Sequence, residues 1–436
     1  MVNTRLLRVG LMMIAAAFLA YGFYTFAERV VIPFLTEGLP GSQDWIRRIP
    51  LVTDSAIDLV AAAGLAVAAA ATWKSPGPAR FLFVAALLFQ IVETSMTVMF
   101  ALAKVEPRHG IEWGRYLAFV ATRVGLWSTT AFGVHFGIKS ASRPAPIGFP
   151  IAAVVATALA QLVLVAHTAM ESDGPRAEAP NILWRFGHVF GFGLVIASLL
   201  LGAASLRVES ERDAWPIARG GFAGVRTVAI ARLVVGVGSA LLMRLCIAMS
   251  SFGACYWLLV LVTPITLALG YWGIASVATV SRVPRIAGVA FVSVACFVAA
   301  TTLDTHASIA LLDFLRSASR DRYVGMYALD GLPSLTLGAG LLQLVATATL
   351  FRVLVLASED RGLSVERSDA ARGMGLAIAA ALCATLVNAA LSGAKPWFGL
   401  LVALPFGIVA LVVGIMAYAA LLRVTRTLSI VLLDDR

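Results

Sequence analysis

The sequence predicts an all-α fold: a polytopic helical membrane protein with about twelve transmembrane helices. Hydrophobic residues make up 60% of the chain and charged residues 13%, whereas soluble domains average about 45–50% and about 25%. The mean hydropathy is +0.89. Apolar residues also form runs of about 18–25 positions, long enough to cross a hydrocarbon core of about 30 Å. Lipid is therefore the expected solvent for most of the surface.

Each predicted span begins or ends where charged residues or proline interrupt an apolar run. Arg8 precedes the first span, Pro50 the second and Arg80 the third. Ends assigned in this way are accurate to about two to four residues. In chain order the predicted spans are Val9–Ala27, Leu51–Trp73, Phe81–Ala103, Tyr116–Ile138, Phe149–Met170, Leu183–Leu206, Thr227–Ser250, Tyr256–Val280, Ile286–Leu303, Leu335–Ala357, Gly373–Leu391 and Trp397–Leu422.

Basic residues are distributed unevenly between the two predicted sides of the membrane. The termini and the even-numbered loops hold the larger share of them, as at Lys74, Arg80 and Lys139. Because Lys and Arg near helix ends tend to stay in the cytoplasm, both termini are predicted to be cytoplasmic. The net charge of +10 then reflects this bias, since no basic aromatic patch indicates nucleic acid binding. Alanine-rich spans and short loops favour a bacterial cytoplasmic (inner) membrane.

A regular spacing of basic residues predicts an internal repeat. Arg80, Arg226 and Arg372 each open an apolar run, and both intervals are 146 residues, close to one third of the 436-residue chain. Each unit then contains about four spans, and an even number makes the copies parallel, related by an axis near the membrane normal. The alternative is that alanine-, valine- and leucine-rich spans resemble one another by composition alone.

The repeat divides one integral membrane domain into three four-helix units around a pseudo-threefold axis. Their predicted limits are residues 1–145, 146–284 and 285–436. Short helices outside the membrane are predicted at Arg207–Gly224 and, as an amphipathic helix at the interface, at His306–Ser319. No nucleotide-binding loop, GxSxG elbow or HExxH run occurs, which excludes soluble catalytic machinery of those types.

Ionisable residues inside the spans are the main functional candidates, because each costs about 2.5–3.5 kcal/mol to insert at mid-membrane. Acidic residues concentrate in the first unit and basic residues in the second. Asp54 and Asp58 are four residues apart, so they share a helix face. The predicted solute or ion pathway consists of Asp54, Asp58, Gln90, Glu93, Arg123, Arg232 and Arg244.

The three arginines of this set are the expected counter-charges of its acidic residues, because a charged group persists in lipid only when it is paired with an opposite charge or in contact with water. Two interpretations follow. The residues line a polar pathway, or they form structural ion pairs between units.

Most histidines fall toward the predicted outer side. His167, His188 and His306, with Asp304, form a candidate metal or haem site, because imidazole and carboxylate bind zinc or iron and two facing histidines bind haem. No HxxxH or HxH spacing supplies two histidine ligands from one helix, however. Scattered interfacial histidines are the alternative, and no cofactor is predicted outright.

Three functional classes remain. The favoured one is a transporter or channel-like protein with a polar intramembrane pathway, which requires that Glu93 and Arg123 adjoin a cavity. The second is a membrane-embedded accessory or scaffold subunit, with a membrane-protein partner or a second copy of the chain as its neighbour. The third is an intramembrane metallo- or haem enzyme that uses the outer histidines. In all three the lipid bilayer is the principal surroundings of the chain.

Overall fold

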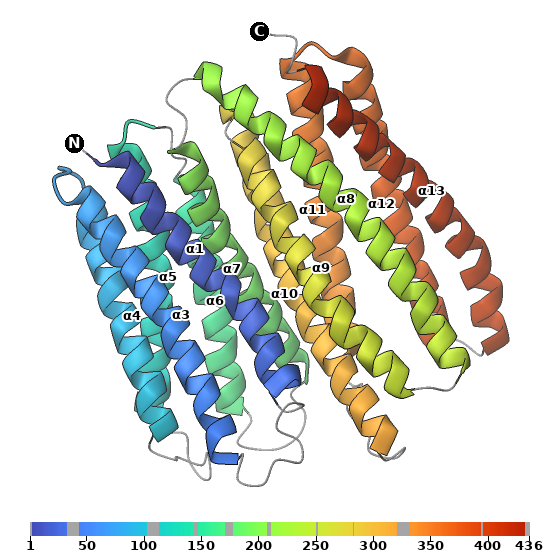
Figure 1. The fold of residues 1–436 in the computed structure, drawn as a ribbon, viewed down its shortest axis with the longest axis horizontal. Coiled ribbons are helices and arrows are strands. Elements are labelled where there is room, and N and C mark those ends of the chain that lie inside the picture. Colours follow the sequence, from blue (N-terminus) through green and yellow to red (C-terminus); the bar gives the residue numbers. More distant parts are fainter. Residues whose placement is uncertain are drawn as a thin grey trace.

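The computed structural model is helical throughout the residues it describes, which are 2–32, 43–102, 113–143, 147–170, 178–206, 211–249, 252–281, 283–320, 332–393 and 396–431. Twelve α-helices run side by side within these ranges, and the predicted all-α class is confirmed (Figure 1). The elements are α1 (Thr4–Phe26), a π-helical turn η1 (Ala27–Val31), α3 (Gln43–Thr72), α4 (Ala79–Leu102), α5 (Trp113–Ser140), α6 (Gly148–Met170), α7 (Glu178–Ser205), α8 (Glu211–Ala248), α9 (Phe252–Val280), α10 (Pro284–Arg320), α11 (Leu332–Asp360), α12 (Ser364–Gly393) and α13 (Pro396–Val431).

Ten of these helices are long and apolar enough, within the described residues, to cross a membrane. In the other two, α6 and α7, the described apolar stretches are shorter, at Gly148–Leu162 and Val189–Ser205. The ends of α1 and α13 where the chain starts and finishes lie on the same side of the array (Figure 1). The chain is therefore a multi-pass integral membrane protein, as its composition predicts.

The helices form two groups of six. In the first group α1 and α3–α7 pack in chain order, and contact between α7 and α1 closes the circuit. In the second group α8–α13 pack in the same manner, and α13 closes the circuit against α8. The two groups stand next to each other (Figure 1). We call them the first and second helix groups.

The joint between the groups is formed mainly by α7 and α10. Gly193 on α7 allows this approach, because a Cβ there would lie only 2.5 Å from the carbonyl oxygen of Ala295 on α10. On another side of α10, Ser293 donates a hydrogen bond of 3.0 Å to the carbonyl oxygen of Ala346 on α11. Within the candidate span of α10, 67% is buried, which is the largest share among the ten candidate spans of the described residues. This helix is the central element of the molecule.

The predicted threefold repeat, with units 1–145, 146–284 and 285–436, stays a prediction. The contacts between helices do not separate these units, because α5 packs on α6 across the first boundary and α9 packs on α10 across the second. The observed grouping instead divides the chain between α7 and α8. Similar apolar composition in all spans gives no signal that would distinguish these two groupings.

Two segments predicted as separate short helices are helical but continuous with spans, so their predicted independence is wrong. The segment Arg207–Gly224 is described from Glu211, where α8 begins, and Phe222 within it is 1% exposed. The segment His306–Ser319 belongs to the C-terminal part of α10, where Leu312 is 1% exposed. Both segments contain apolar residues that pack against neighbouring helices, and these contacts outweigh the charged residues that suggested a surface position.

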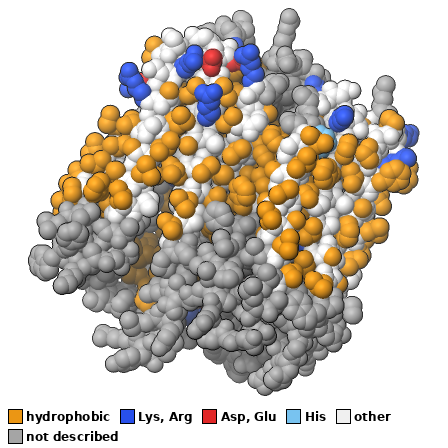
Figure 2. Space-filling model, turned by 180° about the vertical axis from the view of Figure 1, so that it is seen from behind, with side chains coloured by type: hydrophobic (Ala, Val, Ile, Leu, Met, Phe, Trp, Pro, Cys, Tyr) orange, Lys and Arg blue, Asp and Glu red, His pale blue; other side chains and the backbone are white. Residues whose placement is uncertain are grey.

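On the face of the molecule shown in Figure 2, apolar side chains form a broad band, and Lys and Arg side chains gather at one edge of it. This edge lies at the end of the array where the described chain begins and finishes. Among the exposed apolar residues, Leu88, Leu241 and Leu411 are 59%, 64% and 64% exposed. Exposed leucine of this extent is suited to lipid. The predicted cytoplasmic location of the basic edge follows from the positive-inside rule and stays a prediction.

Helix packing in this protein depends on close backbone contact, which makes one stability prediction possible. A Cβ on Gly10 of α1 would lie 2.7 Å from the Gly64 carbonyl oxygen and 2.8 Å from the Ala68 amide nitrogen of α3. Backbone atoms cannot move aside as a side chain can, so Gly10→Ala should lower the free energy of unfolding by about 1–3 kcal/mol. The measurement is the fraction of folded protein in detergent after heating.

Gly236→Ala is the matched control, because nothing lies within 4 Å of a Cβ at that position on α8. Equal thermal stability of the two variants would contradict the packing described for α1 and α3.

Candidate functional site

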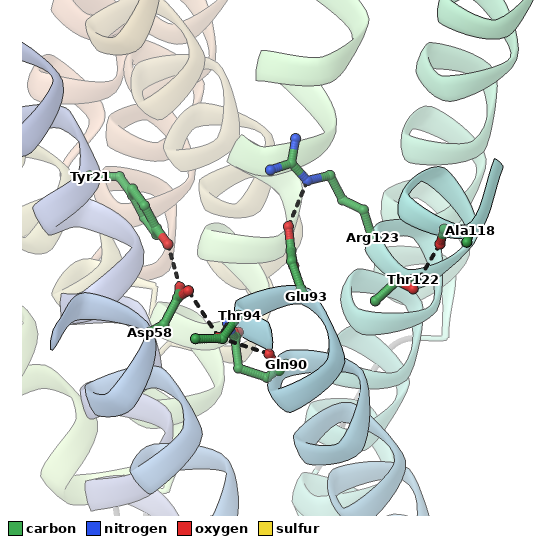
Figure 3. A network of polar contacts seen from close by, with 8 residues as sticks. All are labelled: Tyr21, Asp58, Gln90, Glu93, Thr94, Ala118, Thr122 and Arg123. Atoms are coloured by element: carbon green, nitrogen blue, oxygen red, sulfur yellow. Dashed lines mark hydrogen bonds and ion pairs between the residues drawn. The ribbon is translucent and has the colours of Figure 1, made fainter. Parts of the chain in front are cut away.

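Asp58 on α3 is the centre of a hydrogen-bond network that joins three helices (Figure 3). The hydroxyl group of Tyr21 on α1 donates to Asp58 Oδ1. Thr94 Oγ1 on α4 lies 2.9 Å from Asp58 Oδ2, and Gln90 Nε2 donates to Thr94 Oγ1 over 3.4 Å. Asp58 is 7% exposed and Gln90 2% exposed. The carboxylate is thus buried, with a hydroxyl group beside each of its oxygens.

Glu93 and Arg123 form an ion pair beside this network (Figure 3). Arg123 Nε on α5 donates to Glu93 Oε1 on α4 over 2.9 Å. The Arg123 guanidinium also lies 4.6 Å from the ring centroid of Phe119, one turn earlier on α5. The side chains of Arg123 and Glu93 are 29% and 12% exposed. Arg123 is therefore the counter-charge of Glu93 but keeps part of its surface open.

A cavity of about 220 Å³ adjoins both sets of contacts. Five helices of the first group and two of the second, α9 and α10, contribute to its wall. Its lining residues include the charged or amide groups of Asp58, Gln90, Glu93 and Arg123, together with hydroxyl groups and His306. Aromatic side chains form another part of the wall. They are Phe18, Tyr21, Trp127, Phe192 and Tyr271.

The spacing of polar residues on α4 explains how they reach one cavity. Glu93 lies three residues and Thr94 four residues after Gln90, so both share a helix face with Gln90. Gln90 and Glu93 line the cavity, and Thr94 contacts Asp58 beside it. On α5, Gly125 leaves room for the Phe89 ring, since a Cβ there would lie 2.6 Å from the ring. This contact brings α4 and α5 close enough for the ion pair.

Asp54 lies one helical turn before Asp58, on the same side of α3, as the spacing predicts. It is half-buried and close enough to Asp58 and to Glu28 of η1 for their charges to interact. Asp54 is not among the residues that line the cavity. The three carboxylates form an acidic region next to the cavity.

A second polar cluster lies in the second helix group, around Arg232 on α8. Asp304 on α10 and Tyr418 on α13 are within electrostatic range of Arg232. The guanidinium passes close to α9 at Gly270, where a Cβ would lie 3.0 Å from Arg232 Nη2 and 3.1 Å from Thr301 Oγ1. We call these five residues the Arg232 cluster. The prediction that Arg232 pairs with the acids of the first unit therefore differs from the observed placement, in which Asp304 is its acidic neighbour.

The Arg232 cluster contains polar atoms that the described protein does not satisfy. Thr301 Oγ1 and Tyr418 Oη are buried and lack a hydrogen-bond partner among the described residues. Asp304 is exposed, although it belongs to the most buried span. The described protein therefore does not enclose this cluster on every side.

The helices α9 and α10 stand between the cavity and the Arg232 cluster and contribute polar residues to both. On α9, Tyr271 lines the cavity and its neighbour Gly270 contacts Arg232. On α10, Thr302 lines the cavity and Thr301 adjoins Arg232. Consecutive helical residues point in directions about 100° apart, so a helix between two sites serves both in this way.

The predicted metal or haem ligands are only partly described. The side chains of His167 and His188 lie outside the described residues, so that part of the site stays a prediction. His306 lines the cavity, whereas Asp304 belongs to the Arg232 cluster. These two residues are two positions apart on one helix and therefore do not face each other. Among the described residues, no group of three or more His, Cys, Asp or Glu side chains could hold a metal ion.

Arg244, the last of the predicted pathway residues, is exposed on α8 twelve residues beyond Arg232. It neither lines the cavity nor belongs to the Arg232 cluster. Conversely, the sequence analysis did not identify Tyr21, Thr94, Tyr271 and Tyr418. A hydroxyl group in a span is less costly than a charge and carries no signal when considered alone. Thr94 lies four residues after Gln90, so a search for hydroxyl residues one helical turn from each intramembrane polar residue would have found it.

Comparisons of the chain with protein-family models, with curated proteins and with solved structures find no match. The site must therefore be interpreted from its own chemistry.

The ion pair predicts a non-additive effect of substitutions. Glu93→Gln leaves the Arg123 guanidinium without its counter-charge, which should lower the free energy of unfolding by about 1–3 kcal/mol. A larger loss is not expected because Arg123 is 29% exposed. The variant Glu93→Gln/Arg123→Gln removes both charges and should regain at least half of that loss. Denaturation in detergent of the wild type, both single variants and the double variant measures the coupling. Simple additivity would show that the two charges do not interact.

Proposed function

We propose that this protein transports a small polar solute across the membrane and binds it in the cavity beside Asp58 and the Glu93–Arg123 pair. One observation carries the proposal: an intramembrane cavity of about 220 Å³ is lined by charged residues and by helices of both groups. Ligand sites in helical membrane proteins commonly lie between such groups of helices, near the middle of the bilayer.

The ion pair itself favours transport over a purely structural role. A purely structural pair needs no adjoining space, because the attraction between its charges is strongest where packed side chains exclude water. Here both Glu93 and Arg123 line the cavity, and 29% of the Arg123 side chain is exposed. Charges with open surface in a membrane interior require water or a polar ligand beside them. The cavity provides the space for either.

The position of the cavity also suggests how access could alternate. Its wall combines five helices of the first group with α9 and α10 of the second. A change in the relative orientation of the two groups would therefore open or close it, which is the movement that carries solutes in transporters with two helical bundles. Contact between α7 and α10 is the natural pivot.

The accessory-subunit function and the metallo- or haem enzyme stay alternative predictions, and the cavity favours neither. A bacterial inner membrane with both termini in the cytoplasm is likewise the location we propose, on the basis of loop charge.

Cysteine accessibility tests whether water reaches the cavity. In a background with Cys246, Cys255, Cys296 and Cys383 replaced, Thr302→Cys places a thiol group in the cavity wall. It should react with the membrane-impermeant reagent 2-(trimethylammonium)ethyl methanethiosulfonate, because a thiol group ionises only where water is present. The rate of modification in proteoliposomes is the measurement.

Leu88→Cys is the control, since Leu88 is an apolar residue outside the cavity wall and is 59% exposed. No reaction at Thr302→Cys, or a rate equal to that of the control, would contradict the proposal. Reaction from one side of the membrane at a time would favour a transporter, and simultaneous reaction from both sides would favour a channel.

A further inference from the structure

We infer that the solute is a small organic cation, an alkylammonium compound whose positive charge binds at Asp58. This inference rests on the proposed function, because it concerns the same cavity. It is carried by three properties of the lining: the balance of charge, an unused hydrogen-bond acceptor and the aromatic wall.

Among the residues that the structure describes, Asp58 is a cavity carboxylate that forms no ion pair with a basic side chain. Glu93 is paired with Arg123 over 2.9 Å. The hydrogen-bond partners of Asp58 are the hydroxyl groups of Tyr21 and Thr94, which are neutral. Each Asp58 oxygen can accept more than one hydrogen bond, so both retain acceptor capacity. A buried carboxylate without a counter-charge is costly in a membrane, and a bound cation would supply that charge.

Gln90 supplies a second feature that fits a cation. The residue is 2% exposed and lines the cavity one helical turn from Thr94. Its Nε2 atom donates to Thr94, whereas its Oε1 atom is buried without a hydrogen-bond partner among the described residues. An unsatisfied buried acceptor requires an N–H or O–H donor. A protonated amine bound at Asp58 would provide such a donor.

The aromatic wall suits the alkyl groups of such a cation. The Phe192 ring centroid lies 5.7 Å from that of Phe18 and 5.6 Å from that of Trp127. Aromatic faces attract alkylammonium groups through their negative potential, the interaction used for quaternary ammonium ligands. The volume of about 220 Å³ is below the range of about 300–1,000 Å³ typical of drug-sized ligands, so the solute must be small.

The acidic region next to the cavity also favours a positively charged solute. Asp54, one helical turn before Asp58 on α3, is within electrostatic range of Asp58 and of Glu28 on η1. Several carboxylates near an opening raise the local concentration of cations. Arg123 does not oppose this field at Asp58, since Glu93 balances its charge.

Four solutes of similar shape separate charge from size: tetramethylammonium, tert-butylammonium, neutral tert-butanol and anionic pivalate. Isothermal titration calorimetry on the purified full-length protein in detergent should show binding of the two cations and none of tert-butanol or pivalate. Asp58→Asn keeps the shape of the side chain and its contacts with Tyr21 and Thr94. It should weaken the binding of both cations by a factor on the order of ten or more. Asp369→Asn, which changes a carboxylate on α12 far from the cavity wall, should leave both affinities unchanged.

A second variant keeps the inference testable if Asp58→Asn does not fold. Gln90→Met removes the free acceptor. It should therefore weaken the binding of tert-butylammonium, which carries N–H donors, but not the binding of tetramethylammonium, which has none. Binding of pivalate or tert-butanol in preference to the cations would overturn the inference and leave the proposed transport function standing. Cation binding that survives both Asp58→Asn and Gln90→Met would also overturn it. Failure of all four solutes to bind, together with an unreactive Thr302→Cys, would overturn the transport function itself.

Discussion

An ionisable side chain inside the hydrocarbon region costs about 2.5–3.5 kcal/mol unless the protein compensates it, and this constraint orders the interior of the molecule. The Glu93–Arg123 ion pair, with 2.9 Å between Oε1 and Nε, links α4 to α5. Asp58 contacts hydroxyl groups from α1 and α4. Each helix is thereby rotated so that its polar face points inward and its leucines face lipid. The cavity exists because these polar faces converge without filling the space between them.

The central pair α9 and α10 connects this cavity with the second polar region. Gly270 and Thr301 face the Arg232 cluster, whereas the adjacent residues Tyr271 and Thr302 face the cavity. Arg232 and Asp304 carry opposite charges within electrostatic range of each other. Any movement of α10 relative to α7 would therefore change the surroundings of charged groups in both helix groups. Such coupling suits the proposed transport function, because solute bound in the cavity must change the contacts between the two helix groups.

Sequence reasoning predicted the membrane class, the number of helices and most helix ends, because apolar run length is a strong local signal. It failed where tertiary contacts decide: α8 begins at Glu211 rather than Thr227, and α10 continues through His306 to Arg320. It located the charges of Asp58, Glu93 and Arg123 but could not show that Arg232 belongs with Asp304, since partners on different helices depend on how the helices are arranged. Hydroxyl residues such as Tyr21 and Tyr418 carry no sequence signal alone. The grouping of helices into two sets of six likewise depends on contacts between distant segments.

The most direct test of a polar, solute-accessible interior is an experimental structure of the protein in lipid nanodiscs, determined by electron cryomicroscopy at a resolution that shows bound water. We expect non-protein density with polar contacts to Asp58, Gln90 or Arg123, in a space open to one side of the membrane. A cavity closed by the packing of Phe18, Trp127 and Phe192, or occupied by a lipid acyl chain, would contradict it.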